Sequence, residues 1–154
     1  MDFNKALSVK ASAVEKPPLP PIGHYIFQIT KKPEIKESET SPWSSINFQC
    51  QAVGVFEDAD DVDADDLKKF GGYKNVFSRY SFMFNDEDEV QQQRSTYSLT
   101  RFLVDHLGLD EDVSLMENLT ASLNKRFVGK LRHRPDKNKP EDVYAEIEKT
   151  AAVE

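Results

Sequence analysis

The stretch Leu123–Ile147, LNKRFVGKLRHRPDKNKPEDVYAEI, contains the pattern on which the fold prediction depends. It reads as two short strands, Phe127–Arg134 and Val143–Ile147, joined by a polar turn that holds Pro135 and Pro140. Successive side chains of a strand point to opposite faces of a sheet. The stretch therefore predicts a β-hairpin with one apolar face and one polar face.

The polar face of this predicted hairpin carries three cations and an aromatic ring. Lys130, Arg132 and Arg134 share one side of the first strand, and Tyr144 of the second strand points to the same side. Cations beside an aromatic ring can hold phosphates while a base stacks on the ring. Lys and Arg also line the solvated face of most antiparallel sheets, and the hairpin alone favours this second interpretation.

The length and the cysteine count narrow the class of protein. The 154 residues fit one domain that can bury its own core. The lone Cys50 excludes a disulfide framework within the chain, and no Cys or His stands at zinc-ligand spacing. The N-terminal region lacks a long apolar segment, so we expect no signal peptide, no transmembrane helix and a soluble cytoplasmic protein without a metal or other cofactor.

Charge is distributed unevenly along the chain, whose formal net charge is −7. The segment 57–66 holds seven acids and no base, and without it the formal charge is zero. Between Lys125 and Lys139 there are seven Lys or Arg residues and one acid, Asp136. Because salt screens charges beyond about 8 Å, a local basic surface can bind an anion although the whole protein is acidic.

The rest of the chain supplies three more strands and two helices. The prolines at 17, 18, 20 and 21 predict an extended lead-in over residues 1–21. Alternating side chains predict strands over His24–Lys32, Ser45–Phe56 and Asn75–Phe84, with a polar loop over Glu34–Pro42. The period then changes to 3.6. A helix capped at Ser95 or Thr96 and ended by Gly108 presents one stripe, made of Leu99, Phe102, Leu103, His106 and Leu107. A second helix begins at Ser114 with a capping-box pattern.

The order strand, strand, strand, helices, strand, strand is that of an OB-fold. We therefore predict a mainly β protein, a five-stranded OB-fold barrel with a helical insertion between strands three and four, over residues 22–154. Other small α+β domains can produce the same order of elements.

The acidic segment 57–66 predicts a protruding, mobile loop, because seven acids within ten residues repel each other. A calcium loop is the alternative, since Asp58 and Asp60 resemble the start of one. The glycine at the sixth position and the glutamate at the twelfth are missing, so we expect no calcium site.

The sequence contains no catalytic motif of the common hydrolase, nucleotide-binding or metalloprotease types. Cys50 has the parity of a buried strand position, where a thiol is inert. The acidic pairs lie in solvated loops where nothing raises a carboxyl pKa. We therefore expect a binding protein rather than an enzyme.

The outer faces of the predicted strands gather aromatic, amide and basic side chains and few acids. The second strand offers Asn47, Gln49 and Gln51, and Glu146 is the acid that we find among these positions. Exposed rings on which bases stack and cations that track phosphates are typical of single-stranded nucleic-acid sites. The candidate site residues are Lys32, Trp43, Phe77, Arg79, Lys130, Arg132, Arg134 and Tyr144.

Three segments resemble the small OB-fold single-stranded DNA-binding proteins of bacteriophages: PPIGHYIFQI at the first strand, FVGKLRHRP late in the chain, and the closing YAEI. The resemblance covers about residues 20–153. It implies a protein that coats single strands during replication, recombination or repair without strong sequence preference. Many such proteins end in an acidic tail that recruits partners, whereas this chain ends in TAAVE and carries its acids internally at 57–66.

We therefore expect a non-enzymatic binder of single-stranded DNA, phage or bacterial, whose rings at Trp43, Phe77 and Tyr144 stack bases. The acidic segment would hold replication or recombination proteins, or would compete for the basic face when DNA is absent. Two alternatives stay open. One is a protein–protein module, such as a virion or replisome component on a similar barrel, and the other is an RNA binder.

Overall fold

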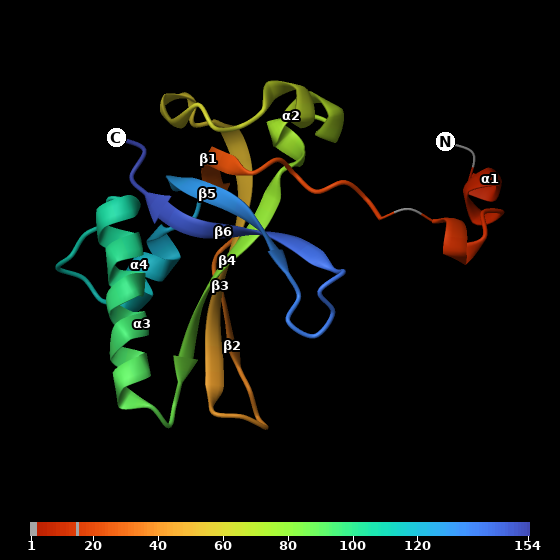
Figure 1. Cartoon of the computed structure of the whole chain (residues 1–154). Helices are drawn as coiled ribbons and strands as arrows, with labels where there is room; N and C mark the ends of the chain where they lie inside the picture. Colours follow the sequence, from red (N-terminus) through yellow and green to blue (C-terminus); the bar gives the residue numbers. More distant parts are fainter. Residues whose placement is uncertain (1–2, 15) are drawn as a thin grey trace.

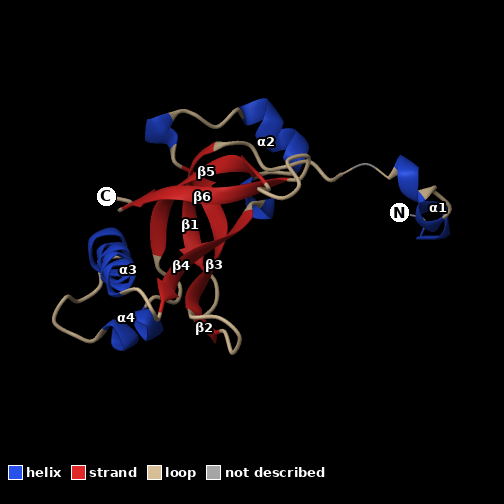
Figure 2. Ribbon diagram, turned by 60° about the horizontal axis from the view of Figure 1, so that its bottom comes forward, coloured by secondary structure: helices blue, strands red, loops and turns tan. Residues whose placement is uncertain are grey.

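The computed structural model describes residues 3–14 and 16–154, in which six antiparallel strands form one sheet accompanied by four α-helices (Figure 1). The strands are β1 (Gly23–Ile29), β2 (Glu34–Glu37), β3 (Trp43–Val55), β4 (Phe77–Asn85), β5 (Arg126–Pro135) and β6 (Val143–Ala151). The helices are α1 (Phe3–Leu7), α2 (Ala64–Phe70), α3 (Glu89–Arg101) and α4 (Leu115–Ala121). Helices α3 and α4 lie together beside the sheet, and α2 lies at another side of it (Figure 2).

The long strand β3 connects the two halves of the sheet. It pairs with β2 and then with β1 along one edge and with β4 along the other. Strand β1 also pairs with β5, which forms the predicted hairpin with β6. The hairpin is confirmed and is longer than predicted. Strand β2 is an addition, because it lies within the segment that we predicted as a polar loop.

The sheet is not closed into a barrel, so the prediction of a closed five-stranded barrel is wrong on this point. Strands β4 and β6 lie close to each other, yet no ladder joins them in the described residues. Helix α3 gives part of the reason, because it occupies the outer edge of β4. Gln91 Nε2 and Ser95 Oγ donate to the Met83 carbonyl at 2.8 and 2.6 Å, and Gln92 Nε2 donates to the Asn85 carbonyl at 2.8 Å.

The inner face of the sheet carries the core, as the alternation of side chains predicts. Tyr25, Phe27 and Ile29 of β1 are fully buried, and so are residues from β3, β5 and the helical segment: Phe48, Cys50, Ala52, Phe127, Leu131, Leu99, Phe102 and Leu103. The Phe102 ring makes edge contacts with Phe48 and Phe127 at centroid distances of 5.1 and 5.0 Å. The helical stripe therefore packs directly on the sheet.

Helix α3 starts earlier than the sequence pattern predicts. Its N-cap is Asp88, whose carboxylate accepts a hydrogen bond from the Gln91 backbone N–H at 3.0 Å, so a cap at Ser95 or Thr96 is wrong. The first two turns are almost entirely polar and gave no apolar period to detect. The helix continues through a π-helical segment, Phe102–His106, and ends at Gly108 with φ +73°, as predicted. Ser114 caps α4 through the Glu117 N–H at 3.1 Å, which confirms that prediction.

The acidic segment 57–66 contains a short 3-10 turn and the start of a helix, so the prediction of a loop is wrong for these two parts of it. A 3-10 turn, Glu57–Ala59, precedes α2, which begins at its N-cap Asp63. The Asp63 carboxylate accepts a hydrogen bond from the Asp66 N–H at 2.9 Å. Acids in the first turn and lysines in the last turn both interact favourably with the helix dipole. Three of the seven acids, Asp63, Asp65 and Asp66, therefore stabilise this helix.

The N-terminal arm runs away from the sheet. Helix α1 and a 3-10 turn, Ala11–Ala13, lie apart from the body, and an extended proline segment leads from them to β1 (Figure 1). The Tyr25 hydroxyl donates to the Pro21 carbonyl at 2.7 Å and fixes the end of this segment. None of the described helices is both long enough and apolar enough to cross a bilayer.

Candidate nucleic-acid interface

The outer face of the β3–β4 ladder carries two of the predicted site residues side by side. Gln49 lies opposite Arg79, and Gln51 lies opposite Phe77, in the antiparallel register. Directly opposed residues in such a ladder share one face. Phe77 is 62% exposed and Arg79 is also exposed, so the predicted parity of β4 is confirmed.

These side chains border a concavity of about 670 Å³, which we call the β3–β4 hollow. Its lining consists of Thr30, Lys31, Gln49, Cys50, Gln51, Phe77, Ser78 and Arg79. The Thr30 N–H donates to the Gln49 carbonyl at 3.0 Å, which holds the end of β1 beside β3. An aromatic ring, two amides and two cations therefore meet in a hollow that no carboxylate lines among the described residues.

Cys50 also lines the hollow, but its side chain is buried. Burial raises the pKa of its thiol to about 12, so it stays protonated at neutral pH. A thiol in that state is a poor nucleophile. In the described part of the chain there is also no group of three His, Cys, Asp or Glu side chains that could hold a metal ion.

The three predicted cations of the β5–β6 hairpin, Lys130, Arg132 and Arg134, are held in ion pairs. Arg132 Nη2 lies 2.6 Å from Glu146 Oε1, and Arg134 Nε lies 3.3 Å from Glu146 Oε2. Lys130 Nζ and Arg132 Nη1 each lie 3.9 Å from Glu148. Two carboxylates therefore stand among the three cations, and the expectation of a face almost free of acids is wrong for the hairpin.

A register shift explains why the sequence pattern missed Glu148. Lys130 pairs with Lys149, and the next residue, Leu131, pairs with Ile147, so Glu148 is an extra residue in β6. Such a bulge changes the facing of the side chains around it. Strand β6 also continues to Ala151, four residues beyond the predicted end.

The hairpin residues and the β3–β4 hollow lie at different ends of the sheet. Arg126 pairs with Gln28, close to the end of β1 that borders the hollow. Arg134 stands eight residues further along β5, which corresponds to roughly 26 Å of extended strand. The prediction of one continuous wall that joins Arg79 to the hairpin cations and Tyr144 is therefore wrong.

Trp43, Lys32 and Tyr144 also lie outside the lining of the hollow. Trp43 pairs with Asn85 at the far end of the β3–β4 ladder, eight residues from Gln51. Lys32 follows the lining residue Lys31 and is exposed. Tyr144 pairs with Arg134 in the hairpin and is 50% exposed. Of the three predicted stacking rings, Phe77 is the one in the hollow.

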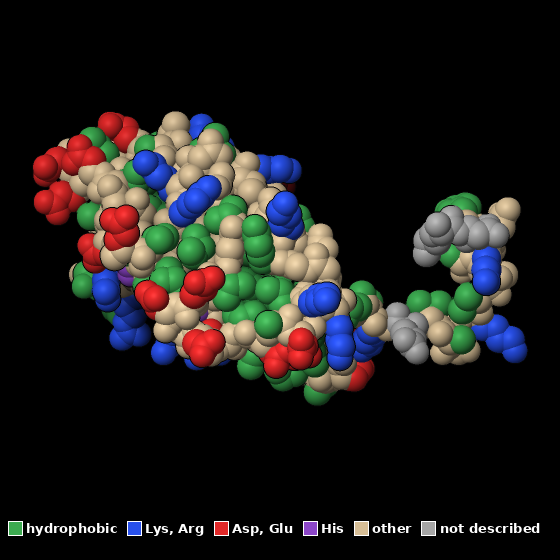
Figure 3. Space-filling view, turned by 90° about the horizontal axis from the view of Figure 1, so that it is seen from above, with side chains coloured by type: hydrophobic (Ala, Val, Ile, Leu, Met, Phe, Trp, Pro, Cys, Tyr) green, Lys and Arg blue, Asp and Glu red, His purple; other side chains and the backbone are tan. Residues whose placement is uncertain are grey.

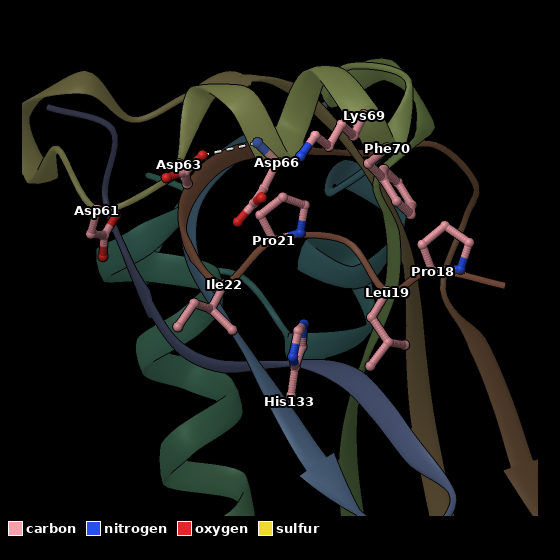
Figure 4. Close-up of a pocket in the computed structure, with 10 residues that line it drawn as sticks. All are labelled: Pro18, Leu19, Pro21, Ile22, Asp61, Asp63, Asp66, Lys69, Phe70 and His133. Atoms are coloured by element: carbon pink, nitrogen blue, oxygen red, sulfur yellow. Dashed lines mark hydrogen bonds between the residues drawn. The ribbon is translucent and has the colours of Figure 1, made fainter. Parts of the chain in front are cut away.

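A second concavity of about 580 Å³ lies between the proline segment, α2 and β5 (Figure 4). Leu19, Pro21, Ile22 and Phe70 give it an apolar lining, and Asp61, Asp63, Asp66, Lys69, Pro18 and His133 complete it. Three carboxylates against one lysine disfavour a phosphate ligand there. Viewed from above, the molecule shows hydrophobic, basic and acidic side chains interspersed, without a large patch of one sign (Figure 3).

Sequence reasoning missed Lys31 and a group of cations on α3 and β6, Arg94, Arg101 and Lys149. The spacing of the two arginines, seven residues apart on one helix, was the available signal.

A scan against protein-family models finds no match to this chain, and a search among curated proteins finds no similar sequence.

Proposed function

We propose that this protein binds single-stranded DNA without catalysis, on an open sheet with the strand connections of an OB-fold. Apart from β2, the strands follow one another as in that fold, with the helices inserted between β4 and β5. The pairings of β1 with β3 and β5, of β3 with β4, and of β5 with β6 also agree with it. The OB-fold is a frequent scaffold for single-strand binding.

The β3–β4 hollow is the observation that carries this proposal. The exposed Phe77 ring offers a stacking surface, worth about 1–3 kcal/mol per base. Arg79 and Lys31 stand beside it to neutralise phosphates, and Lys32 follows in the chain. The amides of Gln49 and Gln51 can both donate and accept hydrogen bonds, so they fit any base edge. The expected result is binding with little sequence preference.

The biological role follows from the resemblance to phage OB-fold single-stranded DNA-binding proteins. On that basis we propose action in phage or bacterial DNA replication, recombination or repair. The acidic segment 57–66 has exposed carboxylates on its 3-10 turn and on α2, which could recruit other replication proteins. The proposed site does not include the hairpin residues or Trp43, because none of them lines the β3–β4 hollow. The residues concerned are Trp43, Lys130, Arg132, Arg134 and Tyr144.

The test is binding of fluorescein-labelled oligo-dT, measured by anisotropy. Phe77→Ala should weaken binding about tenfold, because one stacked base is lost. Arg79→Ala should reduce the slope of log K against log salt by about 0.7, the value for one phosphate on a single strand. Tyr144→Ala is the matched control, since it removes an exposed ring remote from the hollow. No binding of the native protein at low salt would refute the proposal.

A protein–protein module is the second candidate function. Trp43 and Met83 are exposed large apolar side chains on one face of the β3–β4 ladder near its end, and Ile35 of β2 is exposed on the other face. Neighbouring exposed apolar side chains such as Trp43 and Met83 are found on docking surfaces. The anisotropy experiment separates the two functions, because a protein-docking module would show no oligo-dT affinity that depends on Phe77.

A further inference from the structure

A second basic concavity lies on the side of β4 that faces α3. It consists of two adjoining hollows, of about 480 and 310 Å³, which share Tyr80 and Ser98. We call it the α3 groove. The side chains that define it are Tyr80, Arg94, Tyr97, Arg101, His106 and Lys149.

The cations of this groove are less engaged in ion pairs than Lys130, Arg132 and Arg134 of the hairpin. Among the residues that the structure describes, neither Arg94 nor Lys149 forms an ion pair, and Arg101 has one exposed partner, Asp105, at 3.4 Å. Of the carboxylates that the structure describes, Glu148 alone lines the groove. Tyr97 is 65% exposed between the two arginines. The groove thus combines three cations with an accessible aromatic ring.

Helical spacing aligns these side chains on one stripe. Arg94, Tyr97 and Arg101 stand at positions i, i+3 and i+7 of α3, which face the same way. Leu99 and Phe102 are buried against the core on another side of the helix. A solvated helix face would also present Arg and Tyr. It would not place them along a concavity that Lys149 of β6 helps to line.

The groove adjoins the β3–β4 hollow along β4. Ser81 lines the groove and Arg79 lines the hollow, and both side chains project from the same face of β4 two residues apart. That spacing corresponds to about 7 Å of strand. In the described part of the chain β4 is not hydrogen-bonded to β6, so no strand found there separates the two concavities. A bound strand can therefore pass from one to the other across β4.

From this geometry we propose that the α3 groove binds the phosphates of further nucleotides of the same DNA strand, with Arg94, Arg101 and Lys149 as the contacts and Tyr97 as an additional stacking surface. This inference rests on the proposed function, since the strand enters from the β3–β4 hollow. The footprint then covers the hollow, the edge of β4 and the groove, whereas Arg132, Arg134 and Tyr144 of the hairpin stay outside it.

The test compares a short and a long strand on the full-length protein. Oligo-dT of about 5 nucleotides fills the hollow alone, and oligo-dT of about 16 nucleotides reaches the groove. The variant Arg94→Gln/Arg101→Gln/Lys149→Gln should bind the long strand at least about tenfold more weakly, with a salt slope smaller by about 2. Its affinity for the short strand should stay unchanged. Phe77→Ala should weaken both.

A matched control removes three charges elsewhere. Lys10→Gln/Lys68→Gln/Lys137→Gln changes the net charge equally at exposed sites outside the groove and should leave the ratio of the two affinities unchanged. Equal loss on both strands in the groove variant would overturn the inference, because it would show a general charge effect. An unchanged affinity for the long strand would also overturn it, and would favour another ligand such as an acidic peptide. If Phe77→Ala has no effect on the short strand, the proposed function itself fails.

Discussion

Arg132 donates two hydrogen bonds to Glu146 across the β5–β6 hairpin, from Nε at 2.9 Å and from Nη2 at 2.6 Å. The same carboxylate lies 3.3 Å from Arg134 Nε. One glutamate thus partly neutralises two arginines that the sequence pattern assigns to phosphates. A phosphate at these arginines would compete with this carboxylate for their positive charge.

We therefore predict that the hairpin arginines contribute little to DNA binding. Arg132→Ala should change the Kd for oligo-dT by less than about threefold, because an exposed ion pair is worth about 0–1 kcal/mol and its removal also frees Glu146. Arg79→Ala should have a larger effect, since no ion pair of Arg79 is found in the described residues. Glu146→Gln is the informative control: it frees both arginines from their ion pairs and should also leave the Kd nearly unchanged, because both lie far from the β3–β4 hollow. An equal loss for Arg132→Ala and Arg79→Ala, measured by anisotropy, would contradict this assignment.

Local periodicity predicted the facing of most strand residues correctly. Tyr25, Phe27 and Ile29 are buried and Phe77 and Arg79 are exposed, because alternation is a property of each strand by itself. The assembly of faces from different strands was not predictable in this way. It depends on long-range register, such as the pairing of Arg126 with Gln28, and on the bulge at Glu148.

The acidic segment shows a different limit of sequence reasoning. The helix signal was present, since Asp63 precedes Asp66 by three residues and Gly71 follows the last turn with φ +107°. The prediction of a loop gave more weight to the seven acids within ten residues than to this helix signal. In the structure, Asp63, Asp65 and Asp66 stand at the start of α2, where negative charge is favourable.

Gly129 is predicted to be irreplaceable by alanine because of the aromatic core beneath it. An added Cβ would lie 2.8 Å from Phe27 Cδ2 and 3.3 Å from Ile147 Cγ2. Gly129→Ala should lower the free energy of unfolding by about 1–3 kcal/mol, the usual cost of overpacking. Gly54→Ala is the matched control, since nothing lies within 4 Å of its Cβ position, and it should be neutral. Urea denaturation measures both, and equal stability of the two variants would refute the packing argument.

Asp61 is predicted to make stability depend on pH. Burial disfavours its ionised form, but hydrogen bonds from the His24 backbone N–H at 2.8 Å and from the His24 ring at 2.6 Å outweigh this and hold the pKa of the carboxyl below its usual value. A carboxyl whose pKa is lower in the folded state stabilises above its unfolded pKa of about 3.9. That contribution is lost as the pH falls through the lower, folded pKa.

Asp61→Asn should therefore destabilise the protein by about 1 kcal/mol at pH 7, where the charged hydrogen bonds are complete. The difference from the native protein should shrink below about pH 4. Urea denaturation at several pH values provides the measurement. Asp58→Asn, at an exposed position in the same segment, serves as the control and should show no such dependence. A difference that stays constant down to pH 3 would exclude ionisation of Asp61 as its cause.

Trp43 provides a readout of where the strand runs. It is the only tryptophan in the chain, and eight residues of β3 separate it from Gln51 at the hollow, roughly 26 Å of extended strand. Stacking of a base quenches an indole only on contact. Saturating oligo-dT of about 5 nucleotides should therefore leave the Trp43 emission unchanged while anisotropy reports binding. A Phe77→Trp variant should be quenched by the same oligonucleotide, because its indole then lies in the hollow. Quenching of Trp43 in the native protein, without quenching at position 77, would move the DNA path to the β2–β3–β4 end of the sheet.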